Sequence, residues 1–274
     1  MSTTLMFMGP PGTGKTTALA YRARQGAEEY GPDLISICSL TRAAAAQVLR
    51  QELLLPRDHV GTLQSFAYHA LGEPVIGDSP KKLREWNEWI AAEDEPRFQV
   101  SGAAADLDEP GGDYGAAGET QGDRSYAAYQ FCRAAQEDIR SLPETDQDFA
   151  ALWETWLQEM GCLDFTGLLE EALDSCDAAP GSPACLLMDE AQDTSRLGME
   201  LVRKWGRAAE YLLLFGDPLQ NLFQWCGTDA GAFTGFPAAP EDKRVLSQSY
   251  RVPRLVHACA GAWIAPLRAE LEAA

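Results

Sequence analysis

The sequence predicts an α/β fold in which helices flank a parallel sheet and a mainly helical insertion interrupts the chain. Apolar runs typical of strands alternate with helical patterns, and this alternation is the signature of a parallel sheet. Two of the runs, at 184–188 and 211–215, are almost continuously hydrophobic, as expected for strands that are covered on both faces. In residues 73–160, by contrast, the pattern is mostly helical.

Taken in chain order, five strands and four helices are expected in the core. The strands are expected at 5–8, 34–39, 184–188, 211–215, and 245–246 with its neighbours. The helices are expected at about 15–30, 42–54, 63–71 and 195–208. We therefore divide the chain into a discontinuous core and one insertion, with the boundaries 1–72 and 161–274 for the core and 73–160 for the insertion.

Within and just after the insertion, residues 81–93 and 125–175 are expected to be helical. Residues 101–122 are rich in Gly, Ala and Asp, a composition that predicts a mobile loop. Tryptophans recur at helical i, i+3 spacing, which indicates an apolar core for the insertion rather than a surface on which bases stack. These tryptophans are Trp86, Trp89, Trp153 and Trp156.

Charge is distributed unevenly along the 274 residues. The formal net charge is −19, and residues 73–180 hold 25 acidic against 7 basic side chains, or −18 of that total. Affinity for phosphate backbones rests on Lys and Arg, so the total argues against a nucleic-acid partner, but the flanking regions are close to neutral and leave the question open. The acidic insertion is either a docking surface for a protein partner or a solvated face that keeps the chain in solution.

The sequence disfavours two classes of protein, namely membrane proteins and proteins stabilised by disulfide bonds. No apolar run approaches the roughly 20 residues that a bilayer span needs, and no signal peptide is recognisable, so we expect a cytoplasmic protein without membrane contact. The seven cysteines are scattered and form no CxxC pair, so we expect reduced and mostly buried thiols.

The strongest chemical signal is Gly-Pro-Pro-Gly-Thr-Gly-Lys-Thr at 9–16, between the first strand and a helix. Such a loop curls backbone N–H groups around the phosphates of a nucleoside triphosphate, for which we expect ATP, while Lys15 supplies a cation and Thr16 ligates Mg²⁺. The expected nucleotide contacts are Gly9, Pro10, Gly12, Thr13, Gly14, Lys15, Thr16 and Thr17. The loop alone does not separate helicases from kinases, AAA+ ATPases or transporters.

A second apolar strand ends in the acidic pair Asp189 and Glu190. In a phosphate-binding fold, an Asp at this place holds the magnesium ion and the adjoining Glu polarises the attacking water, which indicates hydrolysis. The alternative is that these acids cap the following helix, a role for which Asp193 or Ser195 is also suited.

Residues 189–194, Asp-Glu-Ala-Gln-Asp-Thr, resemble motif II of the superfamily 1 helicases of the UvrD/Rep type. Five further segments resemble other stretches of that family in the same order, at 39–48, 60–66, 163–169, 214–225 and 246–251. The resemblance implies a RecA-like, P-loop NTPase core and the ATP-binding domain of a DNA helicase that uses ATP and Mg²⁺. It further implies translocation on single-stranded DNA from 3′ to 5′.

The resemblance also implies roles for single residues. Gln220 would sense the γ-phosphate, Arg251 would stabilise charge on the transferred phosphoryl group, and Tyr250 would stack on adenine. Together with Glu190, Gln220 and Arg251 form the expected catalytic set. Two alternatives stay open, namely that Gln220 is an ordinary turn residue and that Tyr250 and Arg251 are a surface pair before a helix starting at Pro253.

Contacts with single-stranded DNA are implied in the same way. Trp225 would stack on a base, and core packing is its alternative role. Phe66 and Leu63 also fit the apolar stripe of a helix. The expected DNA-binding residues are Arg42, Thr62, Gln64, Phe66 and Trp225.

Several features depart from the family pattern. Gln64 stands where a histidine is usual, Ala43 where a lysine is usual with Arg42 as its substitute, and Thr17 where an arginine is common. Only eight residues precede Gly9, so the upstream glutamine motif that reads adenine is not found and base selectivity is left open.

The motifs of a second RecA-like domain are not found after 246–251. Because such motors move by closing two domains around the nucleotide, we expect slow ATP hydrolysis, weak DNA binding and no unwinding from this chain alone. The second domain would lie in the same or another chain. The alternative function is a non-motor P-loop ATPase, a switch or assembly factor that acts by binding a protein.

Overall fold

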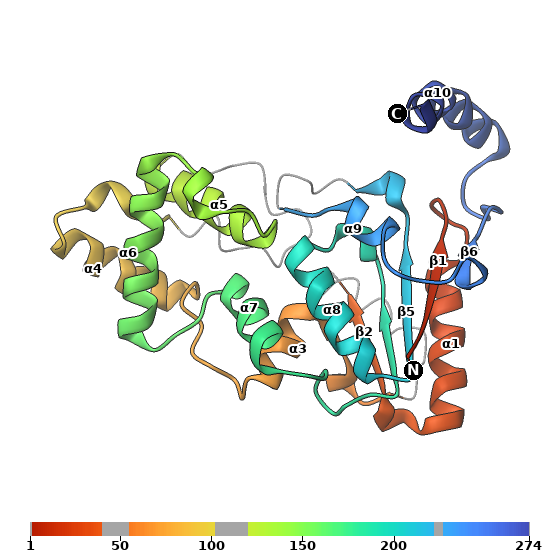
Figure 1. Ribbon diagram of the computed structural model, residues 1–274, viewed down its shortest axis with the longest axis horizontal. Coiled ribbons are helices and arrows are strands. Elements are labelled where there is room, and N and C mark those ends of the chain that lie inside the picture. Colours follow the sequence, from red (N-terminus) through yellow and green to blue (C-terminus); the bar gives the residue numbers. More distant parts are fainter. Residues whose placement is uncertain (1, 40–54, 102–119, 222–226, 274) are drawn as a thin grey trace.

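The computed structural model describes residues 2–39, 55–101, 120–221 and 227–273. These residues form a six-stranded sheet in the order β3-β2-β4-β5-β1-β6, with every neighbouring pair parallel. The strands are β1 (Thr3–Met8), β2 (Ile35–Ser39), β3 (Val60–Thr62), β4 (Cys185–Met188), β5 (Tyr211–Gly216) and β6 (Lys243–Val245). A parallel α/β sheet is therefore confirmed (Figure 1).

One strand of the sheet was not among the five expected. Val60–Thr62 forms β3, which pairs with β2 at one edge, with Val60 opposite Ile37. Three residues are too few to show an alternating pattern, so pairing with β2 decides their conformation.

The helices confirm much of the predicted pattern. They are α1 (Lys15–Tyr30), α3 (Leu63–Ala70), α4 (Pro80–Ala92), α5 (Gln121–Ala134), α6 (Glu144–Met160), α7 (Phe165–Ser175), α8 (Arg196–Ala208), α9 (Ala230–Thr234) and α10 (Arg254–Ala273). The helix predicted at 42–54 lies outside the described residues.

Two predicted boundaries need correction. Residues 125–175 are not one helical stretch, because the chain turns between α5 and α6 and again at Gly161, which ends α6 in the left-handed conformation. Gln121 and Gly122, assigned to the mobile loop, belong to α5, whose start is capped by Thr120, since its hydroxyl accepts from the Asp123 N–H at 3.1 Å. Residues 102–119 of that predicted loop lie outside the described residues.

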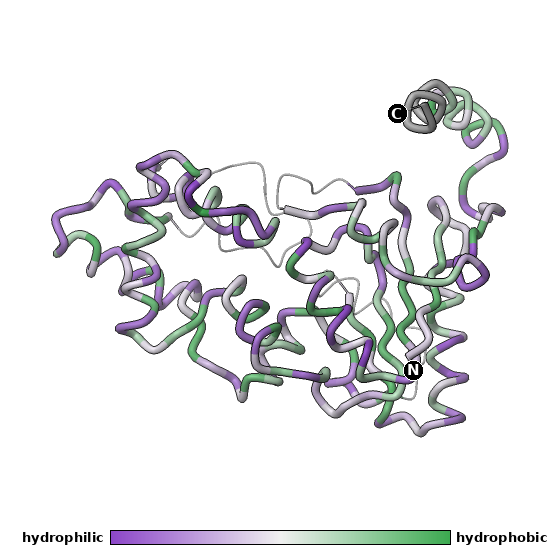
Figure 2. The backbone as a smooth tube through the Cα atoms, viewed as in Figure 1, coloured by the Kyte–Doolittle hydropathy of each residue, from purple (hydrophilic) through white to green (hydrophobic). Residues whose placement is uncertain are grey.

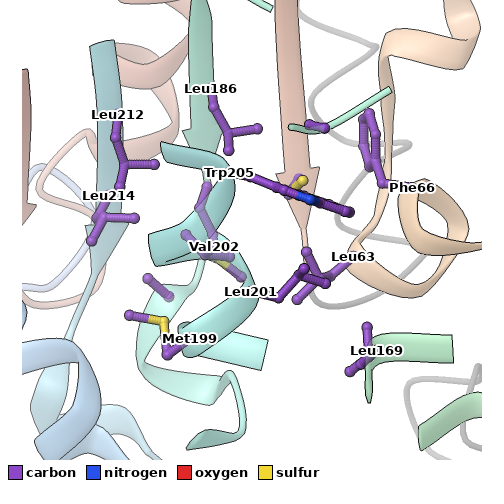
Figure 3. Close-up of a cluster of buried hydrophobic side chains, with 14 of the residues drawn as sticks. Leu63, Phe66, Leu169, Leu186, Met199, Leu201, Val202, Trp205, Leu212 and Leu214 are labelled. Atoms are coloured by element: carbon purple, nitrogen blue, oxygen red, sulfur yellow. The ribbon is translucent and has the colours of Figure 1, made fainter. Parts of the chain in front are cut away.

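Each face of the sheet buries its own apolar cluster. Helix α1 covers one face, where its alanines and Leu19 pack on Phe7 and Phe215. Helices α3, α7 and α8 cover the other face, where Trp205 packs among Leu186, Leu212 and other aliphatic side chains (Figure 3). The central strands are hydrophobic along much of their length (Figure 2) because both their faces are covered.

Residues 83–162 contain a third buried cluster, centred on tryptophan rings. Trp86, Trp153 and Trp156 are fully buried, and Trp89 stacks on Trp86 with ring centroids 5.6 Å apart. The expectation that these tryptophans form a core is confirmed. Helices α4, α5 and α6, which carry this cluster, lie to one side of the sheet (Figure 1). The division of the chain at 73 and 160 stays a prediction, which this separate cluster supports.

Two predictions, one on membrane spans and one on the cysteines, can be compared with the described residues. None of their helices combines the length and apolarity that a bilayer crossing requires. The six described cysteines are all free thiols and four of them are buried, which confirms the expectation for these six; Cys226 lies outside the described residues.

Candidate nucleotide-binding site

The loop at 9–16 connects β1 to α1, as its sequence predicts. Gly12 and Gly14 have φ angles of 76° and 87°, in the left-handed region that favours glycine, and these two positions allow the chain to curl before the helix. The Thr13 hydroxyl donates to the carbonyl of Pro10 at 2.8 Å, which ties the loop to itself. The first N–H groups of α1 face outward from its N-terminus, where an anion is favoured.

Lys15 is buried beneath this loop. Its Nζ donates to the carbonyl of Gly9 at 2.7 Å and lies 3.4 Å from that of Pro10. A cation held against the loop from inside complements a phosphate bound by its backbone.

A cavity of about 500 Å³ opens beside the loop, large enough for a nucleotide. Its walls come from four separate parts of the sequence, and every residue of the expected catalytic set contributes. The lining residues are Pro11, Gly12, Gly14, Lys15, Thr16, Thr17, Glu190, Gln220, Tyr250 and Arg251. The fold thus brings together Glu190, Gln220 and Arg251.

The segment that follows β6 lies across the phosphate-binding loop. The Leu246 N–H donates to the carbonyl of Met8 at 2.7 Å, the Ser249 hydroxyl to Pro11 at 2.8 Å, and the Tyr250 N–H to Gly12 at 2.8 Å. A Cβ atom on Gly12 would overlap the Cβ of Arg251, so this approach requires glycine. The contact places the exposed side chains of Tyr250 and Arg251 at the cavity, directly before α10.

Asp189 is the buried member of the acidic pair. Burial, together with the neighbouring charge of Glu190, raises its pKa to about 6, although the Glu190 N–H and the cation of Lys15 partly oppose the rise. Two carboxylates that repel each other beside a phosphate-binding loop are a donor set suited to Mg²⁺, which takes carboxylate oxygens together with phosphates. Asp189 and the half-buried Thr16 are therefore fitting ligands.

Two polar residues of this site were missed in the sequence. The Gln192 side-chain amide joins the acidic turn to the end of β5, since its Nε2 donates to Glu190 at 3.0 Å and its Oε1 accepts from the Asp217 N–H at 2.9 Å. Asp217 in turn accepts from the side-chain amide of Gln220. Two signals could have indicated them: both lie in segments that resemble the helicase family, and both follow strands that end at the same edge of the sheet.

The residues expected to contact DNA are not all exposed. Thr62 is 6% exposed and caps α3 by accepting from the Ser65 N–H, while Phe66 is 3% exposed within the core shared by α3 and α8. Phe66 fits the packing alternative, Thr62 serves as a helix cap, and only Gln64 of these three is half-buried. Arg42 and Trp225 lie outside the described residues.

Comparison with known proteins identifies a family for this chain. The family model of the UvrD/REP helicase N-terminal domain matches residues 1–240. A search of curated proteins found no match. The matched residues include the phosphate-binding loop, the acidic pair, Gln220 and five of the six strands of the RecA-like sheet. The chain therefore belongs to the UvrD/REP helicase N-terminal domain family and contains a superfamily 1 helicase motor domain.

Proposed function

We propose that this chain binds ATP with magnesium in the 500 Å³ cavity and hydrolyses it as the ATP-binding half of a DNA motor that moves 3′ to 5′ on a single strand. The observation that carries the proposal is the convergence of Lys15, Glu190, Gln220 and Arg251, from four separate parts of the sequence, on one cavity.

Each residue has a distinct task in phosphoryl transfer, which depends mainly on positioning and charge. Lys15 and the N-terminus of α1 bind the phosphates. Glu190 orients water and accepts its proton, and Arg251 stabilises negative charge on the transferred group. Gln220 reports whether the γ-phosphate is present. Thr16 and Asp189 would hold Mg²⁺, which neutralises phosphate charge when bound.

DNA contact and movement are part of the same proposal. Gln64, Arg42 and Trp225 contact the single strand, while Thr62 and Phe66 support α3 from within. A second RecA-like domain, in the same or another chain, closes over the nucleotide and converts hydrolysis into movement.

Replacing Lys15 tests the nucleotide site. Lys15→Ala should weaken binding of a fluorescent ATP analogue, with Mg²⁺ present, by roughly tenfold or more, since it removes a charged hydrogen-bond donor. Titration followed by fluorescence anisotropy measures this. Lys204→Ala is a matched control, because Lys204 also donates to a backbone carbonyl, Leu173, at 2.8 Å, but on α8. If Lys15→Ala binds the analogue as tightly as the parent, the proposal is wrong.

A further inference from the structure

We propose that Gln192 is a positioning residue for this hydrolysis, one that holds Glu190 and the turn carrying Gln220 in a single arrangement. The inference rests on the proposed function. Gln192 is 1% exposed and does not line the cavity, so it acts through its neighbours rather than on the nucleotide.

The side-chain amide of Gln192 has a partner for each polar group. Its Nε2 donates to the carboxylates of Glu190 at 3.0 Å and Asp193 at 2.9 Å, and its Oε1 accepts from the Asp217 N–H at 2.9 Å. A backbone N–H only donates and a carboxylate accepts, so the chemistry of these partners fixes which end of the amide is oxygen. An ionised glutamate at position 192 could still accept the hydrogen bond from the Asp217 N–H, but it could not donate one to Glu190.

Glu190 needs such a restraint because its backbone is strained. Its φ angle is 50°, a left-handed conformation that residues with a side chain seldom adopt. Strained residues persist where surrounding contacts over-determine them, and they gather at functional sites. The amide of Gln192 donates to the Glu190 carboxylate, and this hydrogen bond fixes the direction of that carboxylate.

The opposite end of the network reaches the turn that carries Gln220. Asp217, positioned by Gln192, accepts from the Gln220 side-chain amide, and the backbone carbonyl of Gln192 accepts from Asn221 at 2.7 Å. A Cβ atom on Gly216 would lie 2.6 Å from the Gln192 Oε1, so the amide fits only beside a residue without a side chain. One buried amide thus sets the relative position of two groups that face the cavity.

Gln192→Glu is the sharpest test, because it keeps the size of the side chain. Its carboxylate would repel Glu190 and Asp193 and lose the donor, so single-turnover ATP hydrolysis should slow by roughly ten- to a hundredfold at pH 8. Affinity for ADP with Mg²⁺ should stay within about twofold of the parent, as expected when an interaction outside the binding surface is removed. As the pH falls toward 6, the carboxyl regains a proton that can donate, so the deficit relative to the parent should narrow.

Gln147→Glu is the matched control, because the Gln147 side-chain amide also donates a hydrogen bond within the chain, to the carbonyl of Leu142 at 2.7 Å, but at the start of α6. It should hydrolyse ATP at the parent rate. Should Gln192→Glu fail to fold, Gly216→Ala replaces it, since the added methyl group displaces the Gln192 amide without changing its chemistry.

Three results for Gln192→Glu would each overturn the inference. The first is a hydrolysis rate equal to that of the parent, and the second is a loss of ADP affinity as large as the loss of rate. The third is a rate deficit relative to the parent that does not change with pH. Lys15→Ala separates the two proposals: if it abolishes nucleotide binding while Gln192→Glu hydrolyses at the parent rate, only the positioning role fails. If Lys15→Ala binds like the parent, or if the parent shows no single-turnover hydrolysis, the proposed function fails and this inference with it.

Discussion

The ionised carboxylate of Asp189 destabilises the folded chain when no cation is bound, although the same carboxylate is a ligand in the proposed magnesium site. Its pKa of about 6 lies above the ordinary value of 3.8 because of burial and the charge of Glu190. An acid whose pKa is raised by folding binds its proton more tightly in the folded chain. The folded state therefore loses stability as the pH rises from about 4 through 6, and the ionised group is destabilising above that range.

Asp189→Asn should consequently stabilise the metal-free chain. A shift of about two pKa units corresponds to roughly 3 kcal/mol, so the free energy of unfolding should rise by up to that amount at pH 8 and hardly change at pH 4. The Asn side chain can still accept from the Glu190 N–H, as Asp189 does at 3.1 Å. Urea unfolding at both pH values with a chelator present measures the difference. A less stable variant at pH 8 would contradict the argument.

At the scale of the element, one buried carboxylate joins three helices. Asp164 caps α7 by accepting from the Gly167 N–H at 2.6 Å, and it also accepts from Arg133 of α5 at 2.7 Å and Trp153 of α6 at 3.0 Å. Burial alone would raise its pKa. The charge and the hydrogen bond of Arg133 oppose this rise, and hydrogen bonds from Gln130 and Trp153 add to the effect, so the pKa lies below its ordinary value. The carboxylate therefore stays ionised and paired.

Removing the cation of this pair should be costly. Arg133→Gln leaves Asp164 buried without its counter-charge, so the free energy of unfolding should fall by about 3 kcal/mol or more. Arg196→Gln breaks an exposed bridge to Asp229, with the arginine side chain 55% exposed, and should cost less than about 1 kcal/mol. Denaturant unfolding of both variants checks the contrast, and equal losses would show that burial does not decide the strength of these bridges.

For the whole molecule, the site lies where the parallel strands end. The phosphate-binding loop follows β1, the acidic pair follows β4, Gln220 follows β5 and Arg251 follows β6. This edge is where ligands bind in open α/β sheets. The described residues form one side of the nucleotide site in the proposed motor, and movement requires a second domain that closes over the nucleotide.

The 274-residue chain alone should hydrolyse ATP slowly and displace no strand from a duplex. Steady-state phosphate release and a fluorescent strand-displacement assay measure these two activities. Robust unwinding by the purified chain would contradict this expectation.

Binding of single-stranded DNA separates the motor from the switch hypothesis. A motor domain should bind weakly, lose affinity as salt rises, and bind roughly tenfold more weakly with Trp225→Ala, because a stacked base contributes about 1–3 kcal/mol. Trp263→Ala is the control, since Trp263 lies exposed on α10. Fluorescence anisotropy across a salt series measures both variants. No detectable binding at low salt would favour a protein-binding switch.

The sequence by itself determined the local parts of this protein. Helix α1 covers the predicted residues 15–30, and α3 and α8 end within one residue of their predictions, because apolar periodicity and capping residues act over a few positions. The loop at 9–16 and the pair Asp189 and Glu190 were also recognisable, since their chemistry needs fixed residues at fixed spacing.

Only the tertiary structure decided how these parts meet. Strand β3 exists because β2 pairs with it, and Phe66 is a core residue because α7 packs against α3. Gln192 lies three residues beyond Asp189 in sequence, yet its amide reaches Asp217 at the end of the neighbouring strand β5, and Arg251 reaches Gly12 from the far end of the chain. Such contacts arise from strand order and packing between distant segments, and neither leaves a periodic or local pattern in the sequence.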